Sequence, residues 1–298
     1  MNGKPRPFTL LIALLSSLLI VCVGGYYVFS VRSSLWIKSV TEILEVTTQG
    51  RHALDTYLEK DKETLHILAT ELSITDSDDA SSIEKKMGLP YDEETSYVCV
   101  VFSLARVYTN FTETGTSLGE DDLKLFQSLE GNGVREPFLD GYTGVRKLGV
   151  YERFHFADGA EGIVQKTQTL KSISKRFSLS FFDDSGFSYV VNRAGDVLVR
   201  SMHRNSNRTF QNLFDIIDLQ GNDAEAVDSL RNSLANGDRG VAEFRYSGEE
   251  YVFCYVPLED AEGWYVLSII PNAVIMKQVN DIVSRTLWLC AVILVCLV

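Results

Sequence analysis

The chain is poor in cysteine and has no arrangement of cysteine or histidine that is typical of a metal site. Three of its five cysteines, Cys22, Cys290 and Cys296, lie in apolar stretches near the two ends. Cys99 and Cys254 lie inside apolar, strand-like runs, where cysteine is most often a small buried side chain. Because no C-x-x-C or H-x-x-x-H spacing occurs, we predict no structural metal, no disulfide and no cofactor.

Motifs that mark common enzyme classes are also scarce. The chain contains no H-E-x-x-H and no P-loop sequence. Acidic pairs such as Asp121-Asp122, Asp183-Asp184 and Glu249-Glu250 are adjacent in sequence. Neighbours on a strand face opposite sides and neighbours in a turn are solvated, so a catalytic carboxylate pair is not expected. We predict that residues 1–298 carry no enzymatic activity.

Charge is missing from the first apolar stretch, residues 8–29. As a helix this stretch is about 33 Å long, enough to cross the hydrocarbon core of a membrane. A cleaved signal peptide is the alternative, but its apolar run is usually about 7–15 residues and ends at an A-x-A pattern, which is missing here. We predict an uncleaved membrane helix over 8–30. Lys4 and Arg6 place residues 1–7 in the cytoplasm, because basic residues favour that side.

A second uncharged stretch, residues 286–298, has the composition of a membrane helix. It reaches only about 20 Å as a helix, too short to span a membrane. Trp288 has the position of an interfacial aromatic residue. We therefore predict that 286–298 is a truncated second membrane helix, that 31–285 is extracytoplasmic, and that an output domain follows in the complete protein.

The region between these stretches is strongly acidic. All 40 acidic residues lie within 31–285, and of the 28 basic residues only Lys4 and Arg6 lie elsewhere. An acidic surface repels nucleic acid, so we exclude nucleic acid as a partner. The exception is the segment 202–214, in which His203, Arg204 and Arg208 could hold an anion. We favour a loop paired with nearby acids for this segment.

A long helix is predicted over residues 34–74, which contain no proline and one glycine. Leucines on a heptad-type spacing form a stripe that also includes polar positions: Leu44, Thr47, Arg51, Leu54, Leu58, Asp61, Leu65, Leu68 and Leu72. The polar members argue against a tight coiled coil along the whole helix. We expect one face to pack on its own domain, part to pair with a second subunit, and the helix to end in the polar segment 73–79.

The second half of the chain predicts an antiparallel α+β module. Strands are expected at 187–192 and 197–200, then helices within 207–236, then strands at 241–246, 251–256 and 264–270. Residues 90–170 follow a looser version of this plan, with strands at 97–102, 105–108, 145–156 and 162–169 and a helix at 118–129. Residues 274–285 are expected to be helical and to lead into the second apolar stretch.

One long anchored helix followed by two small α+β modules resembles the double Cache sensor domains of bacterial receptors. The run from Gly186 to Ser201 resembles the family pattern G-x-x-Y-x-V-D-x-x-G-x-x-I-x-x-S, and 240, 255–257 and 263–271 resemble the strands that close the module. The resemblance implies an α+β fold with two PAS-like antiparallel sheets flanked by transmembrane helices. It also implies a homodimeric plasma-membrane receptor that detects a small molecule for a histidine kinase, a diguanylate cyclase or a chemotaxis signalling domain.

Seven segments follow from the pattern and the resemblance together. They are a cytoplasmic tail (1–7), a first transmembrane helix (8–30), a signalling helix (31–75), a membrane-distal module (76–180), a membrane-proximal module (181–272), a juxtamembrane helix (273–285) and a truncated second transmembrane helix (286–298).

The distal module usually holds the ligand in this family. Its amino-acid-binding branch carries an Arg-x-Trp-Tyr arrangement, and this chain has no tryptophan between Trp36 and Trp264. We therefore predict no amino-acid ligand. Arginine can fork onto a carboxylate and tyrosine can line a pocket, so candidate ligand residues are the polar and aromatic ones on predicted strands: Arg106, Tyr108, Tyr142, Arg146, Tyr151, Arg153 and His155. For each arginine the alternative is a solvated strand residue.

Two other classes stay open on the sequence. One is a membrane-tethered extracellular enzyme, which turnover by this chain would favour. The other is a membrane protein that binds a protein partner, which binding to that partner alone would favour.

Overall fold

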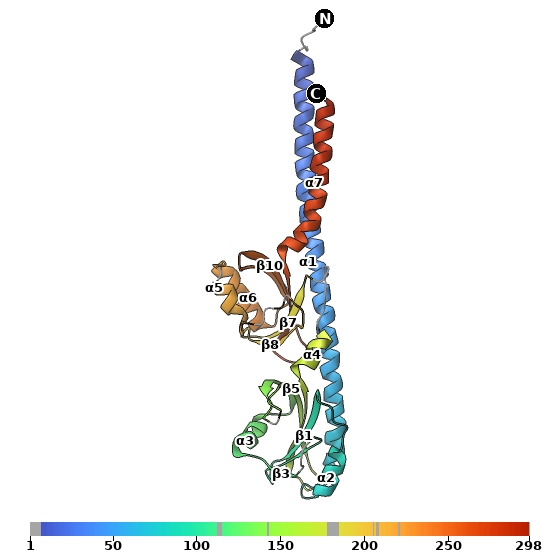
Figure 1. Cartoon of the computed structure of the whole chain (residues 1–298), viewed down its shortest axis with the longest axis vertical. Helices are drawn as coiled ribbons and strands as arrows, with labels where there is room; N and C mark the ends of the chain where they lie inside the picture. The colour runs from blue at the N-terminus through green and yellow to red at the C-terminus, as the bar shows by residue number, and fades with distance from the viewer. Residues whose placement is uncertain are drawn as a thin grey trace.

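The computed structural model describes residues 7–111, 115–141, 143–177, 185–204, 206, 209–219 and 221–297. One very long helix, α1, runs beside two sheets that follow one another along its length (Figure 1). The two ends of the chain lie at the same end of the molecule, beyond the proximal sheet.

Helix α1 extends without interruption from Pro7 to Ser73. Its 67 residues correspond to about 100 Å. The sequence predicted a membrane helix and a signalling helix as separate segments, and the structure joins them. Within α1 no proline follows Pro7, so no residue removes an internal backbone hydrogen bond. Among the described residues, α1 is the one helix long and apolar enough to cross a membrane; its apolar window has a mean hydropathy of 1.5 and is not buried in the protein.

The predicted stripe of α1 is buried. Leu54, Leu58, Leu65 and Leu72 are at most 1% exposed, and the polar Asp61 is 3% exposed. The helix therefore packs one face on its own domain, as the pattern predicted. It ends at Ser73, and α2 (Ala80–Met87) begins after Asp79, whose carboxylate accepts a hydrogen bond from the Ser82 N–H at 3.1 Å.

The distal sheet is antiparallel and six-stranded, in the order β3-β2-β1-β6-β5-β4. Its strands are β1 (Thr95–Val101), β2 (Arg106–Thr109), β3 (Thr116–Ser117), β4 (Asn132–Leu139), β5 (Arg146–His155) and β6 (Glu161–Thr169). One face packs on the leucines of α1, and α3 (Glu120–Ser128) covers the other through Phe126.

The proximal sheet is antiparallel and five-stranded, in the order β8-β7-β11-β10-β9. Its strands are β7 (Phe187–Asn192), β8 (Val197–Arg200), β9 (Gly240–Tyr246), β10 (Glu249–Pro257) and β11 (Trp264–Pro271). Helices α5 (Leu213–Leu219) and α6 (Ala224–Asn236) cover one face. The other face packs on α1 and on the start of α7 (Asn272–Leu297) through Ile43, Val252 and Ile275.

Two helices connect these parts. The amphipathic α4 (Leu170–Phe177) leaves β6 and packs between α1 and β8. Helix α7 runs alongside the N-terminal part of α1 (Figure 1). The two approach closely at Gly24, where a Cβ atom would lie 3.1 Å from Cys290 Sγ.

The predicted strands of both modules are confirmed within one to two residues, and β3 and β4 were not predicted. Residues 131–133 were interpreted only as a break after the helix. Strand β4 contains Pro137 and a register shift between Arg135 and Phe138, so it lacks the regular alternation that identifies a strand.

Candidate functional site

The distal module contains a cavity between its sheet and α3. Its volume is about 320 Å³, within the usual range for a small-molecule site. Apolar side chains form most of its wall: Val98, Val107, Phe111, Leu118, Leu125, Phe126, Phe138 and Leu139. The polar lining residues are Asp122, Arg135, Asp140, Gln165 and Thr167.

Arg135 contributes a half-buried cation to this cavity. Its guanidinium lies 3.6 Å from the centroid of the Phe138 ring, a cation–π contact that orients it. Burial lowers the pKa of Arg135, although the nearby Asp122 acts in the opposite direction. The side chain of Arg135 has no ion pair or hydrogen bond to another described residue, and its backbone pairs with β5. The bulge in β4 places Arg135 and Phe138 together, which alternation along a strand would not have predicted.

A chain of buried polar groups connects the cavity-lining residues Asp140 and Thr167. Lys147 Nζ lies 3.2 Å from Asp140 Oδ2 and donates to Ser96 Oγ at 3.1 Å. Ser96 Oγ in turn lies 2.7 Å from Thr167 Oγ1. Burial acts to raise the pKa of Asp140, but hydrogen bonds from Thr143 and Lys147 outweigh it, and the pKa is lowered. Asp140 is therefore a carboxylate that Lys147 already neutralises and that Thr143 hydrogen-bonds.

Gln165 has an unused donor. Its side chain is 1% exposed, and its Nε2 atom has no hydrogen-bond partner among the described residues. Gly149 makes room for it on the neighbouring strand, because a Cβ atom there would lie 2.1 Å from Gln165 Nε2. A buried donor without a partner is costly. A bound acceptor in the cavity would satisfy it.

Strand β6 connects this cavity to α1. Gln165 and Thr167 face the cavity, and the alternate residues Lys166 and Gln168 face α1. Asp61 of α1 accepts hydrogen bonds from Lys166 Nζ at 2.5 Å and from Gln168 Nε2 at 2.6 Å. Burial raises the pKa of Asp61, and its hydrogen bond from Lys166 acts in the opposite direction.

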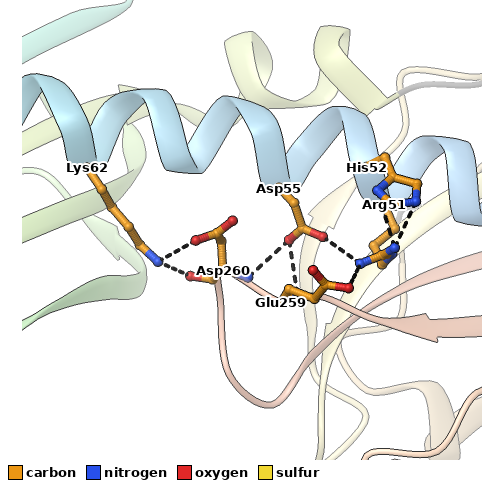
Figure 2. A network of polar contacts seen from close by, with 6 residues as sticks. All are labelled: Arg51, His52, Asp55, Lys62, Glu259 and Asp260. Atoms are coloured by element: carbon orange, nitrogen blue, oxygen red, sulfur yellow. Dashed lines mark hydrogen bonds and ion pairs between the residues drawn. The ribbon is translucent and has the colours of Figure 1, made fainter.

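A second polar contact attaches the proximal module to α1 (Figure 2). Asp55 Oδ1 accepts the backbone N–H groups of Glu259 and Asp260 at 3.1 and 3.2 Å, in the turn between β10 and β11. Asp55 Oδ2 accepts from Arg51 at 3.2 Å, and Arg51 also pairs with Glu259. About two helical turns after Asp55, Lys62 Nζ lies 2.9 Å from Asp260 Oδ1. Each module therefore holds α1 through a buried aspartate.

The residues predicted from the sequence do not line this cavity, as far as the structure describes them. Arg106, Arg146 and His155 are exposed. Tyr108 is fully buried on the side of the sheet that packs against α1. Tyr151 is half-buried beside Gly133, and Arg153 donates to the Gln127 carbonyl oxygen at 2.8 Å and lies over Phe102. Tyr142 and Arg208 lie outside the described residues; His203 stacks on Phe187 with centroids 6.1 Å apart.

The sequence did not single out Arg135, Asp140 or Gln165. The prediction chose arginines and tyrosines on recognisable strands, whereas Arg135 lies on the irregular β4. A signal was present in Arg135 and Phe138 around Pro137, because proline in a strand indicates an edge or a bulge.

One serine motif typical of hydrolases occurs in the chain. Gly115, Ser117 and Gly119 match G-x-S-x-G. Ser117 is an exposed residue at the edge of the sheet, paired with Arg106, and not the strand-to-helix elbow that this motif requires. Its hydroxyl takes part in no hydrogen bond with the residues that the structure describes.

A long helix beside two antiparallel modules is the arrangement that the resemblance to double Cache sensor domains implies. Solved structures agree. The ligand-binding domain of the Pseudomonas aeruginosa PAO1 chemoreceptor PctC, in complex with GABA, is 19% identical, with 78% of this chain and 99% of that chain covered and a TM-score of 0.61. The ligand-binding domain of the Pseudomonas fluorescens chemoreceptor CtaA, in complex with L-isoleucine, is 12% identical, with 83% and 98% covered and a TM-score of 0.64.

The extracellular domain of the putative histidine kinase mmHK1S-Z3 is also similar, with 17% identity, coverage of 83% of this chain and 98% of that chain, and a TM-score of 0.59. At these identities the similarity is one of fold. No protein-family description and no curated protein matches the chain.

Proposed function

We propose that residues 31–285 form the extracytoplasmic sensing region of a bacterial transmembrane receptor, in which a small molecule binds the distal cavity. The observation that carries this proposal is the double role of β6. Gln165 and Thr167 contact the cavity, and Lys166 and Gln168 of the same strand hold Asp61 of α1. A ligand that shifts β6 would therefore act directly on the helix that leads to the membrane.

We propose a ligand with a carboxylate and an apolar body. Arg135 offers a cation with no described ion pair, Gln165 offers an unused N–H, and the remaining wall is largely apolar. Asp140 does not require a ligand cation, because Lys147 neutralises it. The similar chemoreceptor domains were solved with GABA and with L-isoleucine, which also carry carboxylates. The missing tryptophan motif argues against the usual amino-acid site.

The remaining features of the receptor are proposals as well. Lys4 and Arg6 support a cytoplasmic N-terminus, and α1 and α7 support two adjacent membrane helices. We propose that the protein is a homodimer in the plasma membrane, with the domain boundaries given above. A histidine kinase or a diguanylate cyclase would provide the output. A ligand changes this output only if its affinity differs between two states of the receptor.

A thermal-shift screen of residues 31–285 against small organic acids and their uncharged amides tests the proposal. At a hundred times its dissociation constant, a ligand stabilises by about 2.7 kcal/mol, or a few degrees for a domain of this size. We expect acids to stabilise and the matched amides to have no effect. Stabilisation by the amides alone would contradict the role of Arg135. Silence across a well-folded protein would contradict small-molecule sensing.

A further inference from the structure

A groove opens where α1 leaves the apolar stretch, between α1, the start of α7 and the β9–β10 hairpin. A hollow of about 550 Å³ is lined there by Arg32, Arg245, Glu250, Asn272 and Met276, among others. A second hollow of about 410 Å³ shares Arg32, Glu250, Asn272 and Met276, and extends to Trp36 and Glu243. The two form one continuous groove that the ligand-sensing proposal does not use.

The α1 wall of this groove begins in the headgroup layer of a membrane that α1 crosses. Arg32 follows the last residue of the uncharged stretch, Phe29, by three residues, or about 4.5 Å along the helix. The headgroup layer is about 5–7 Å thick on each side of the hydrocarbon core. On α7 the groove lies further from the apolar stretch, because Met276 precedes Arg285, the residue before the second uncharged stretch, by nine residues, or about 13.5 Å along the helix. Trp36 adds an aromatic side chain of the kind that is enriched at this interface.

The charges of the groove are not balanced internally. Arg32 is exposed and forms no ion pair with any residue that the structure describes. Glu250 contacts Arg245 at 3.1 Å and Asn272 at 3.3 Å. Glu243 has no described hydrogen-bond partner, and burial together with the charge of Glu250 raises its pKa. The groove thus has a cation on its α1 wall and a carboxylate on its β9 wall, each available to a ligand.

We propose that this groove binds the headgroup of a phosphatidylethanolamine-type lipid in the outer leaflet. The phosphate would contact Arg32, and the primary ammonium would lie between Glu243 and Glu250. A choline headgroup has no N–H to donate to these carboxylates, and an anionic glycerol headgroup would meet three of them (Glu243, Glu249 and Glu250) without a cation to offer. Such a lipid would contact α1, α7 and the β9–β10 hairpin at the place where α1 passes from the domain into the membrane.

Lipid retention by the full 298-residue chain tests this proposal. The protein is reconstituted in nanodiscs with equal amounts of ethanolamine, choline and glycerol phospholipids, transferred to detergent, and analysed by native mass spectrometry for retained lipid. Since two partly exposed charge contacts are involved, we expect about a five-fold preference for the ethanolamine lipid over the choline lipid. Arg32→Ala and Glu243→Gln should each remove most of this preference.

Lys38→Ala is the matched control, because Lys38 is an exposed cation on α1 that does not line the groove. It should retain the wild-type preference. Equal retention of all three lipids, a preference for the glycerol lipid, or an unchanged preference in Arg32→Ala would overturn the proposal. The groove could instead bind a soluble compound with the same chemical groups, and adding free phosphoethanolamine to the protein in lipid-free detergent tests this. Stabilisation by this compound without selective lipid retention would also overturn it. The ligand screen of residues 31–285 concerns the distal cavity, a different site. The outcome of the lipid experiment therefore does not decide whether the distal cavity binds a ligand.

Discussion

Arg135 is the cation that the proposed ligand chemistry requires, and Arg153 is its natural control. Once the screen identifies a ligand, Arg135→Ala should weaken its binding by about 1.5–3 kcal/mol, the usual range for a hydrogen bond to a charged group. Arg153→Ala should leave affinity within about two-fold, because Arg153 contacts Gln127 and Phe102 outside the cavity. Isothermal titration calorimetry measures both. The reverse result, with Arg153 essential and Arg135 neutral, would restore the site predicted from the sequence.

Asp140 gives the distal module a pH-dependent contribution to stability. Its pKa is lowered in the folded state from the ordinary value of 3.8, so the carboxylate stabilises the fold above pH 3.8 and this contribution is lost as the pH falls through the lowered pKa. At neutral pH, Asp140→Asn should cost about 2–3 kcal/mol, because it leaves Lys147 buried without its partner. Urea unfolding of residues 31–285 measures the difference in the free energy of unfolding between the wild type and Asp140→Asn. It should shrink below pH 3.8, and a difference independent of pH would contradict this role.

The contact between α1 and the β10–β11 turn depends on Asp55 much more than on Glu259. Asp55 is 6% exposed and accepts two backbone N–H groups as well as Arg51, whereas the Glu259 side chain is 77% exposed. Asp55→Ala should destabilise by about 3 kcal/mol, because buried donors and Arg51 lose their acceptor. Glu259→Ala should cost less than about 1 kcal/mol. Equilibrium unfolding and hydrogen exchange of residues 258–263 compare the two variants, and equal effects would be inconsistent with this assignment.

The same helix shows what the sequence could predict. The leucine stripe identified the buried face of α1, and the polar members Arg51 and Asp61 on that stripe are the ones that contact the modules. Their partners Glu259, Lys166 and Gln168 lie about 100–200 residues away in the sequence, and no local pattern indicates such pairs. Regular strands were predictable from alternation. Arg135 was not, because its position depends on a bulge and on packing against α3.

At the scale of the whole molecule, we predict that the distal module lies outside the plasma membrane. Cys99 and Cys254 are buried, and burial raises the pKa of both thiols, that of Cys254 to about 12, so neither should react from the outside. Ser128 is exposed on α3, far from the apolar stretches. In intact cells with a permeable outer barrier, Ser128→Cys should therefore react with a membrane-impermeant maleimide, and the wild type should not. Labelling of Ser128→Cys only after lysis of the plasma membrane would place this module in the cytoplasm.

The two aspartates that hold α1 also constrain how this protein can change during evolution. Asp55 engages the proximal module and Asp61 the distal module, six positions apart on one uninterrupted helix. Inserting or deleting one residue between them rotates one partner by about 100° relative to the other, which would separate one aspartate from its module. In homologues we expect the length of this segment to be fixed. The angle between Asp55 and Asp61 around the helix axis would then stay the same through gene duplication and domain exchange, even where the residues of the ligand cavity have changed.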